Sequence, residues 1–151
     1  MRRSRESDAA ELARLHRATI RHVLSKDYAP EVIVVWSGRT SAKKFCASHQ
    51  THIRHVVVEK GKIIGFGDIG KDGSFGAIYV HKDCIGKGVG SMLIAKIEEL
   101  GRKMGVKKFE FKGSVTAKRF YEKHGYKAVR KVQHLVGGKL PMPVYIMRKY
   151  L

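Results

Sequence analysis

Apolar residues in this 151-residue chain recur at two spacings, and the spacing of three to four residues marks the expected helices. Ser7 is the expected N-cap of the first helix, and Pro30 suits the first position of the second. Thr40 or Ser41 would cap a short third helix. Two further helices lie in the second half of the chain, the last ended by Gly125. The expected helices cover residues 7–24, 30–36, a short segment after 41, 91–104 and 114–125.

Alternation of apolar and polar residues, together with β-branched side chains, marks the expected strands. Two of them, between Ile53 and Ile69, are joined by a tight turn at Gly61. The remaining strands cover residues 1–3, 75–81, 106–112, 126–135 and 143–151. Strands and helices mixed along a chain of this length predict a single α/β (α+β) domain over residues 1–151, with no repeat or linker that would divide it.

The segment from Tyr79 to Gly105 is typical of a strand, a glycine loop and a helix in succession. Gly86, Gly88 and Gly90 place the loop directly before the helix, where backbone N–H groups lack partners and the helix dipole is positive. Such a loop binds anions, and we expect a diphosphate there. The spacing G-x-G-x-G fits neither the dinucleotide fingerprint nor the P-loop.

Two motifs around this loop resemble those of the GNAT superfamily of N-acetyltransferases. The run "IGKGVG" from Ile85 to Gly90 resembles the family's motif A, and "SVTAKRFYEKHGY" from Ser114 to Tyr126 resembles its motif B. Ile85 stands where the family has Arg or Gln, and Ser114 stands where it has Asn. The motifs occur in the family's order, separated by one helix and one strand. On this resemblance the chain is identified as a member of the superfamily.

The resemblance implies the GNAT fold, a mixed, mostly antiparallel sheet of six or seven strands flanked by helices and splayed between two central parallel strands. Acetyl-CoA would enter the cleft between those strands, with its pantetheine arm paired to exposed main chain. The implied cofactor-binding residues are Tyr79, Val80, Ile85, Gly86, Lys87, Gly88, Val89, Gly90, Ser91, Ser114 and Phe120. Tyr121 matches the family's general acid, which would protonate the departing CoA thiolate.

The implied reaction is direct transfer of an acetyl group from acetyl-CoA to a primary amine of an acceptor that the sequence does not identify. Candidates for the acceptor pocket, each of which could instead simply pack on the sheet, are Tyr28, Trp36 and Phe45. The general base stays open among His81, Asp68, Glu110 and water.

The chain holds 31 Lys and Arg against 13 Asp and Glu, which gives a formal net charge of +18. This excess supports a different class of function, a non-catalytic basic module that retains the fold and associates with ribosomes or nucleic acid. It predicts weak, salt-sensitive nucleic-acid binding without sequence preference. We favour a solvated basic surface as the explanation for most of the charge.

No apolar run approaches the length of a membrane span and no leader segment is recognised, so we expect no membrane association and a cytoplasmic location. Cys46 and Cys84 form no paired motif and are expected to be reduced. His49, His52 and His55 have no acidic or thiolate partner nearby in the sequence, so no metal is expected. A homodimer stays an open alternative.

Overall fold

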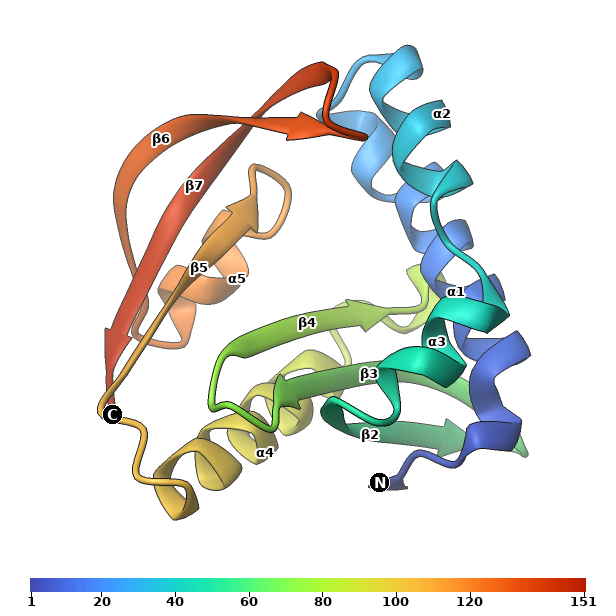
Figure 1. Ribbon diagram of the computed structural model, residues 1–151, viewed down its shortest axis with the longest axis vertical. Helices are drawn as coiled ribbons and strands as arrows, with labels where there is room; N and C mark the ends of the chain where they lie inside the picture. The colour runs from blue at the N-terminus through green and yellow to red at the C-terminus, as the bar shows by residue number, and fades with distance from the viewer.

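The computed structural model describes residues 1–151, and its helices and strands follow one another in the order that the sequence predicts (Figure 1). The helices are α1 (Ala9–His22), α2 (Pro30–Gly38), α3 (Ala42–Ser48), α4 (Val89–Lys103) and α5 (Lys118–Lys123). The strands are β1 (Arg2–Arg3), β2 (His52–Glu59), β3 (Lys62–Gly70), β4 (Phe75–Val80), β5 (Lys108–Ser114), β6 (Lys127–Val136) and β7 (Leu140–Tyr150). No helix here has both the length and the apolar character that crossing a bilayer requires.

Two of the helix ends that differ from expectation, the starts of α1 and α5, are explained by local hydrogen bonds. Helix α1 begins after Asp8, so Ser7 is not its N-cap. The Asp8 carboxylate accepts from the Arg5 N–H at 2.7 Å and pairs with Arg2 at 2.8 Å, which fixes a short 3₁₀ turn before the helix. Helix α5 begins later than predicted because Ser114 accepts from the Ala117 N–H at 3.1 Å and closes a turn there.

The seven strands form two sheets, with the orders β1-β2-β3-β4 and β5-β7-β6. Every ladder in both sheets is antiparallel. The expected α/β architecture with antiparallel strands flanked by helices is therefore confirmed, but one detail differs. No ladder joins β4 to β5, so the two central strands are not hydrogen-bonded to each other and the sheet is divided in two.

Helices cover both faces of the four-stranded sheet (Figure 1). On one face α1 packs Leu12 against Val56 and Phe66 of β2 and β3. On the other face α4 packs Leu93 against Val57. This second contact is close, because a Cβ atom on Gly65 would lie 2.7 Å from the Val89 side chain. The sheet is thus the middle layer of a three-layer unit.

Two apolar clusters join the sheets at opposite ends of the gap between them. One cluster packs α1 and α2 against the tip of the β6–β7 hairpin, and it includes Ile33 and Val136. The other packs α4 and β3 against the three-stranded sheet through Ile97 and Phe109. The sheets are therefore held at the ends and remain apart in the middle.

His16 on α1 is a neutral histidine in the core beside the four-stranded sheet. Its Nδ1 atom lies 2.7 Å from the Thr40 hydroxyl, and its ring packs edge-on against Tyr79 with the centroids 4.3 Å apart. Burial, followed by the positive charges of Arg54 and Arg17, lowers the pKa of His16 to about 4. Its protonation therefore opposes folding.

We expect acid to destabilise the fold through His16. In the unfolded chain its pKa is about 6.5, so below that pH the unfolded state takes up the proton first. The resulting loss is about 2 kcal/mol between pH 7 and pH 5. Urea unfolding at both pH values should show a smaller loss for His16→Gln than for the parent. His22→Gln, at the exposed end of α1, is the control and should keep the parent's pH dependence; equal losses in all three proteins would contradict the assignment.

Candidate active site

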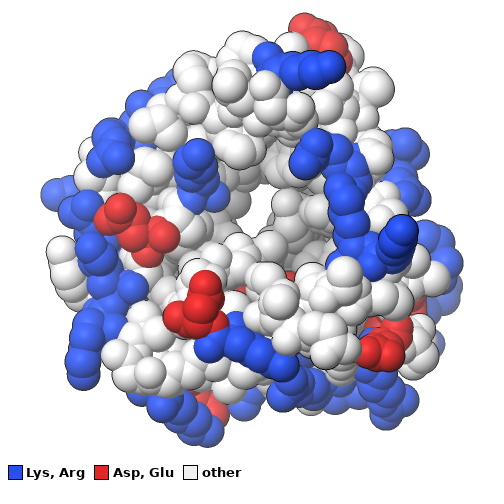
Figure 2. All heavy atoms as spheres, in the orientation of Figure 1, with Lys and Arg blue, Asp and Glu red and all other residues white.

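A cavity of about 770 Å³ occupies the gap between the two sheets. Its wall is formed by β4, the loop before α4, β5, α5, the end of β6 with the turn after it, the start of β7, and the ends of α1 and α2. Figure 2 shows an opening through the middle of one face, bordered by uncharged atoms and ringed farther out by Lys and Arg. This is the cleft expected between the central strands.

The glycine loop offers the cavity a series of unpaired main-chain donors. Gly86 and Gly88 have φ values of 81° and 84°, which favour glycine. None of the N–H groups of residues 86–91 donates a hydrogen bond within the protein. Gly90 lies against the Phe120 ring, where a Cβ atom would be 2.8 Å from the ring edge. The loop is thus shaped to bring a phosphate close to backbone N–H groups at the positive end of α4.

The edge of β4 also presents main chain to the cavity. The His81 N–H donates to the Ile64 carbonyl at 2.8 Å, which sets the alternation along this antiparallel pair. The main-chain N–H and C=O of Tyr79 therefore bond to β3, whereas those of Ile78 and Val80 point away from β3. The Val80 carbonyl accepts from the Thr19 hydroxyl at 3.3 Å. The remaining groups of Ile78 and Val80 point toward β5, which does not pair with them.

A bulge in β4 turns this edge away from β5. Between the pairs Gly67–Ile78 and Ile69–Phe75, three steps on β4 match two on β3. Asp68 occupies the bulge: one carboxylate oxygen accepts from the Ala77 N–H at 2.9 Å and the other from Arg54 Nε at 2.8 Å. Both charged residues are about 95% buried, at 4% and 5% exposure. The buried ion pair therefore fixes the bulge.

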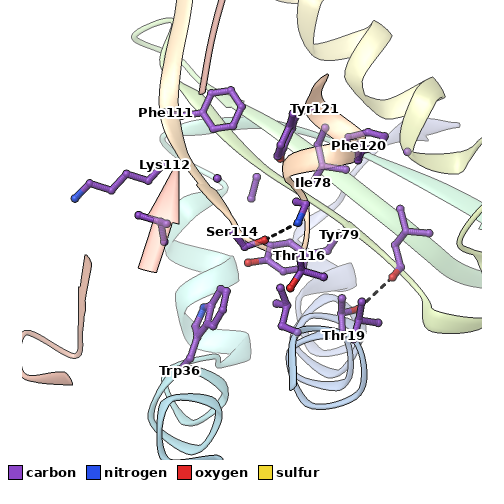
Figure 3. A pocket seen from close by; sticks show the side chains of 18 of the residues that line it. Thr19, Trp36, Ile78, Tyr79, Phe111, Lys112, Ser114, Thr116, Phe120 and Tyr121 are labelled. Atoms are coloured by element: carbon purple, nitrogen blue, oxygen red, sulfur yellow. Dashed lines mark hydrogen bonds between the residues drawn. The ribbon is translucent and has the colours of Figure 1, made fainter. Parts of the chain in front are cut away.

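Tyr121 of α5 and Tyr79 of β4 both line the cavity (Figure 3). The Tyr121 ring is buried among Phe75, Phe111 and Phe120, yet its hydroxyl has no hydrogen-bond partner in the protein. Among side-chain nitrogen and oxygen atoms, only the Ser4 hydroxyl is both fully buried and without a partner. The unpartnered Tyr121 hydroxyl is therefore not fully buried, and since Tyr121 lines the cavity, its oxygen is exposed there. Burial raises the pKa of both phenols well above the ordinary value, and each holds its proton at neutral pH.

Most of the predicted cofactor-binding residues come together on the cavity wall. Those that line it are Tyr79, Val80, Ile85, Gly86, Gly88, Gly90, Ser91, Ser114 and Phe120. The side chains of Lys87 and Val89 do not line it, because Lys87 is exposed and Val89 packs into the core with Leu93. Of the three aromatic residues considered for the acceptor pocket, only Trp36 lines the cavity. Tyr28 instead donates to the Pro143 carbonyl at 2.7 Å.

None of the three side chains considered as general base lines the cavity. Asp68 is held by Arg54 in the bulge. Glu110 pairs with Arg148 at 2.6 Å, and this arginine lowers the pKa of the Glu110 carboxyl. His81 accepts from the Asp83 N–H through Nδ1 at 3.1 Å. Water, the fourth alternative, needs no side chain at the cavity and stays a prediction.

Sequence reasoning missed several polar side chains of the cavity wall. They are Thr19, Arg39, Lys112, Thr116, Lys123, His124 and His134. They come from separate segments of the chain, and no motif marks Thr19, Arg39, Lys112 or His134. The signal that could have indicated part of this set is the motif itself, since Lys123 and His124 lie between Tyr121 and Gly125 on the predicted helix.

Comparisons with known proteins define the class of this fold and site. Residues 24–142 match the family model described as an acetyltransferase (GNAT) domain. The chain therefore belongs to the GNAT family of acetyltransferases, and it is an acyltransferase that depends on acetyl-CoA. No curated protein sequence matches the chain.

Solved structures agree with this family. A GCN5-related N-acetyltransferase from Rhodopseudomonas palustris is 26% identical, with 99% of this chain and 94% of that chain covered and a TM-score of 0.92. The PaiA N-acetyltransferase of Thermoplasma acidophilum, solved in complex with coenzyme A, is 18% identical over 99% and 97%, with a TM-score of 0.78. A ribosomal-protein-alanine N-acetyltransferase from Brucella melitensis is 16% identical over 99% and 98%, with a TM-score of 0.75.

We expect Asp68→Ala to destabilise the protein more than removal of the whole ion pair. The single change leaves the Arg54 charge buried without a partner, which costs about 3–5 kcal/mol. Arg54→Met combined with Asp68→Ala removes that charge and should cost less than Asp68→Ala alone. Chemical denaturation of the parent, Asp68→Ala, Arg54→Met and the double variant measures the difference. A double variant as unstable as the sum of both single changes would show that the two residues act independently.

Proposed function

We propose that residues 1–151 act as one N-acetyltransferase domain that transfers the acetyl group of acetyl-CoA directly to a primary amine. The observation that carries the proposal is the run of unpaired N–H groups of residues 86–91, placed at one end of a cavity on which the Tyr121 hydroxyl opens. The loop would hold the diphosphate, and the free edge of β4 would hold the pantetheine arm through Ile78 and Val80. The thioester would then lie between β4 and β5 beside Tyr121.

In the proposed reaction, the amine nitrogen attacks the thioester carbonyl carbon, the C–N bond forms and the C–S bond breaks. Tyr121 donates its phenolic proton to the departing thiolate. Burial raises the pKa of the Tyr121 phenol, and it would also raise the pKa of a thiol in the cleft, which makes the departing thiolate a stronger base than it is in water. Tyr121 recovers its proton from the amine nitrogen by way of solvent.

The proposed site also favours a neutral amine. Arg39 and Lys112 line the cavity, and no Asp or Glu does. Positive charges near an ammonium group lower its pKa, because they disfavour a second cation. A dedicated carboxylate base is therefore not needed, and water can take the proton that the amine releases.

Gly88→Asp tests the proposed diphosphate site. The space around Gly88 is open, so the fold should survive with a backbone cost of about 1–2 kcal/mol for the positive φ. The new carboxylate would face the phosphates, and we expect CoA affinity to fall at least about tenfold. Gly61→Asp is the matched control, since Gly61 has φ 75° and open space in the distant β2–β3 turn. Calorimetry showing equal CoA affinity in both variants would contradict the loop assignment.

Tyr121→Phe tests the proposed general acid. The change removes one oxygen that opens on the cavity, so CoA affinity should stay at the parent value. Loss of a positioned acid should lower kcat by roughly 10²–10⁴ with any primary amine that the parent acetylates. Tyr126→Phe is the control, because the Tyr126 hydroxyl donates to Glu98 and does not line the cavity. If Tyr121→Phe turns over at the parent rate while Tyr79→Phe does not, the role belongs to Tyr79.

A further inference from the structure

The end of the cavity beside α2 carries basic side chains from three elements. Arg39 follows α2, Lys112 lies on β5 and His134 lies on β6, and all three line the wall. Lys112 Nζ is 3.5 Å from His134 Nδ1, and a Cβ atom on Gly137 would lie 3.7 Å from an Arg39 guanidinium nitrogen. Burial, and then the charges of Lys112 and Arg39, lower the pKa of His134. The three side chains thus share one site.

This cluster is separate from the basic groups that lie near the glycine loop. There, His124 contacts the Ser91 hydroxyl at 3.1 Å and its ring packs on Phe120, with Lys123 beside it. Those groups suit the diphosphate of the cofactor. Figure 1 shows α2 and the β6–β7 turn on the side of the molecule away from α4. In Figure 3 Trp36 lies across Tyr79 from Phe120, and Lys112 extends outward from the cavity.

Acidic side chains are missing from the whole cavity wall. Glu110, whose neighbours on β5 line the cavity, is paired with Arg148 and does not reach it. Asp27 contacts the wall residue Thr116, whose hydroxyl donates to it at 2.7 Å, but Asp27 does not itself line the cavity. An ammonium group beside Arg39 would therefore have no carboxylate on the cavity wall to pair with. Like charges in such a site cost affinity, and desolvation increases the cost.

We propose that the acceptor is an anionic amine, a molecule that carries a carboxylate or phosphate group besides its primary amine, with the anion bound by Arg39. The inference rests on the proposed acetyl transfer and names the class of its acceptor. The guanidinium of Arg39 can donate two parallel hydrogen bonds to a carboxylate or a phosphate. Trp36 and Val136 supply apolar wall for the carbon chain between the anion and the amine. The amine then points from α2 toward Tyr79 and Tyr121.

Acceptors of equal length and different charge test this proposal. δ-Aminovalerate, n-pentylamine and cadaverine carry a carboxylate, a methyl and a second amine at the far end. Calorimetric titration into the complex with CoA should rank them in that order, with the carboxylate at least about tenfold tighter than the methyl, as a charge-assisted hydrogen bond predicts. The same titration with phosphoethanolamine and ethanolamine shows whether a phosphate group binds in place of the carboxylate. Equal or tighter binding of pentylamine or cadaverine, or no measurable binding of both anions, would overturn the proposal.

Charge reversal locates the effect. Arg39→Glu should abolish the preference for the anion, raising KM for the anionic amine at least about tenfold while the thermal midpoint and CoA affinity stay near the parent values. Lys43→Glu, on the exposed face of α3 and outside the cavity, changes the net charge equally and should keep the preference. The same loss in both variants would mean that only the general field acts. Failure of acetyl-CoA itself to bind would refute the proposed function, whereas preferred acetylation of cadaverine would refute only the acceptor class.

Discussion

The cleft of this protein depends on one buried ion pair. Arg54 holds the Asp68 carboxylate in place in the core, and Asp68 accepts from the Ala77 N–H that the bulge leaves without a strand partner. The bulge in turn bends β4 away from β5. Gly76 is required at the same place, because any Cβ there would collide with Asp68. An electrostatic contact within one sheet therefore determines the separation of the two sheets.

Where the two sheets are apart, the apolar contacts that would form between packed sheets are lost, and the fold is less stable for it. Other contacts around the gap must therefore stabilise the fold. The two end clusters supply that stabilisation. Phe75 at the start of β4 stacks on Phe111 of β5 with the ring centroids 3.8 Å apart, which brings the strands together where the bulge begins. At the other end Tyr28 links the β7 main chain to the Val115 N–H at 2.8 Å. Tyr28 thus stabilises the structure around the cavity and does not line it.

Local features of the sequence predicted the elements and the loop, whereas contacts between distant residues decided the rest. Gly86 and Gly88 were predictable because a positive φ before a helix favours glycine whatever the surroundings. The sequence left Asp68 as a candidate general base, because its pairing with Arg54 on the neighbouring strand depends on the fold. Arg39 and His134 lie 95 residues apart and meet only through the packing of α2 on the β6–β7 hairpin. Resemblance to a family identified Tyr121, since periodicity alone places it in the core.

The net charge of +18 is reflected in the cavity, whose wall includes basic side chains and no acidic ones. Acidic side chains are few, and many are paired within the fold: Asp8 with Arg2, Asp68 with Arg54, Glu98 with Lys149, and Glu110 with Arg148. Because these pairs fix carboxylates away from the gap between the sheets, the wall of the cavity carries only positive or neutral groups. A low-dielectric cleft concentrates the field of those groups. The same distribution that would attract a polyanionic cofactor from one side would disfavour a cationic acceptor on the other, in keeping with the proposed acceptor class.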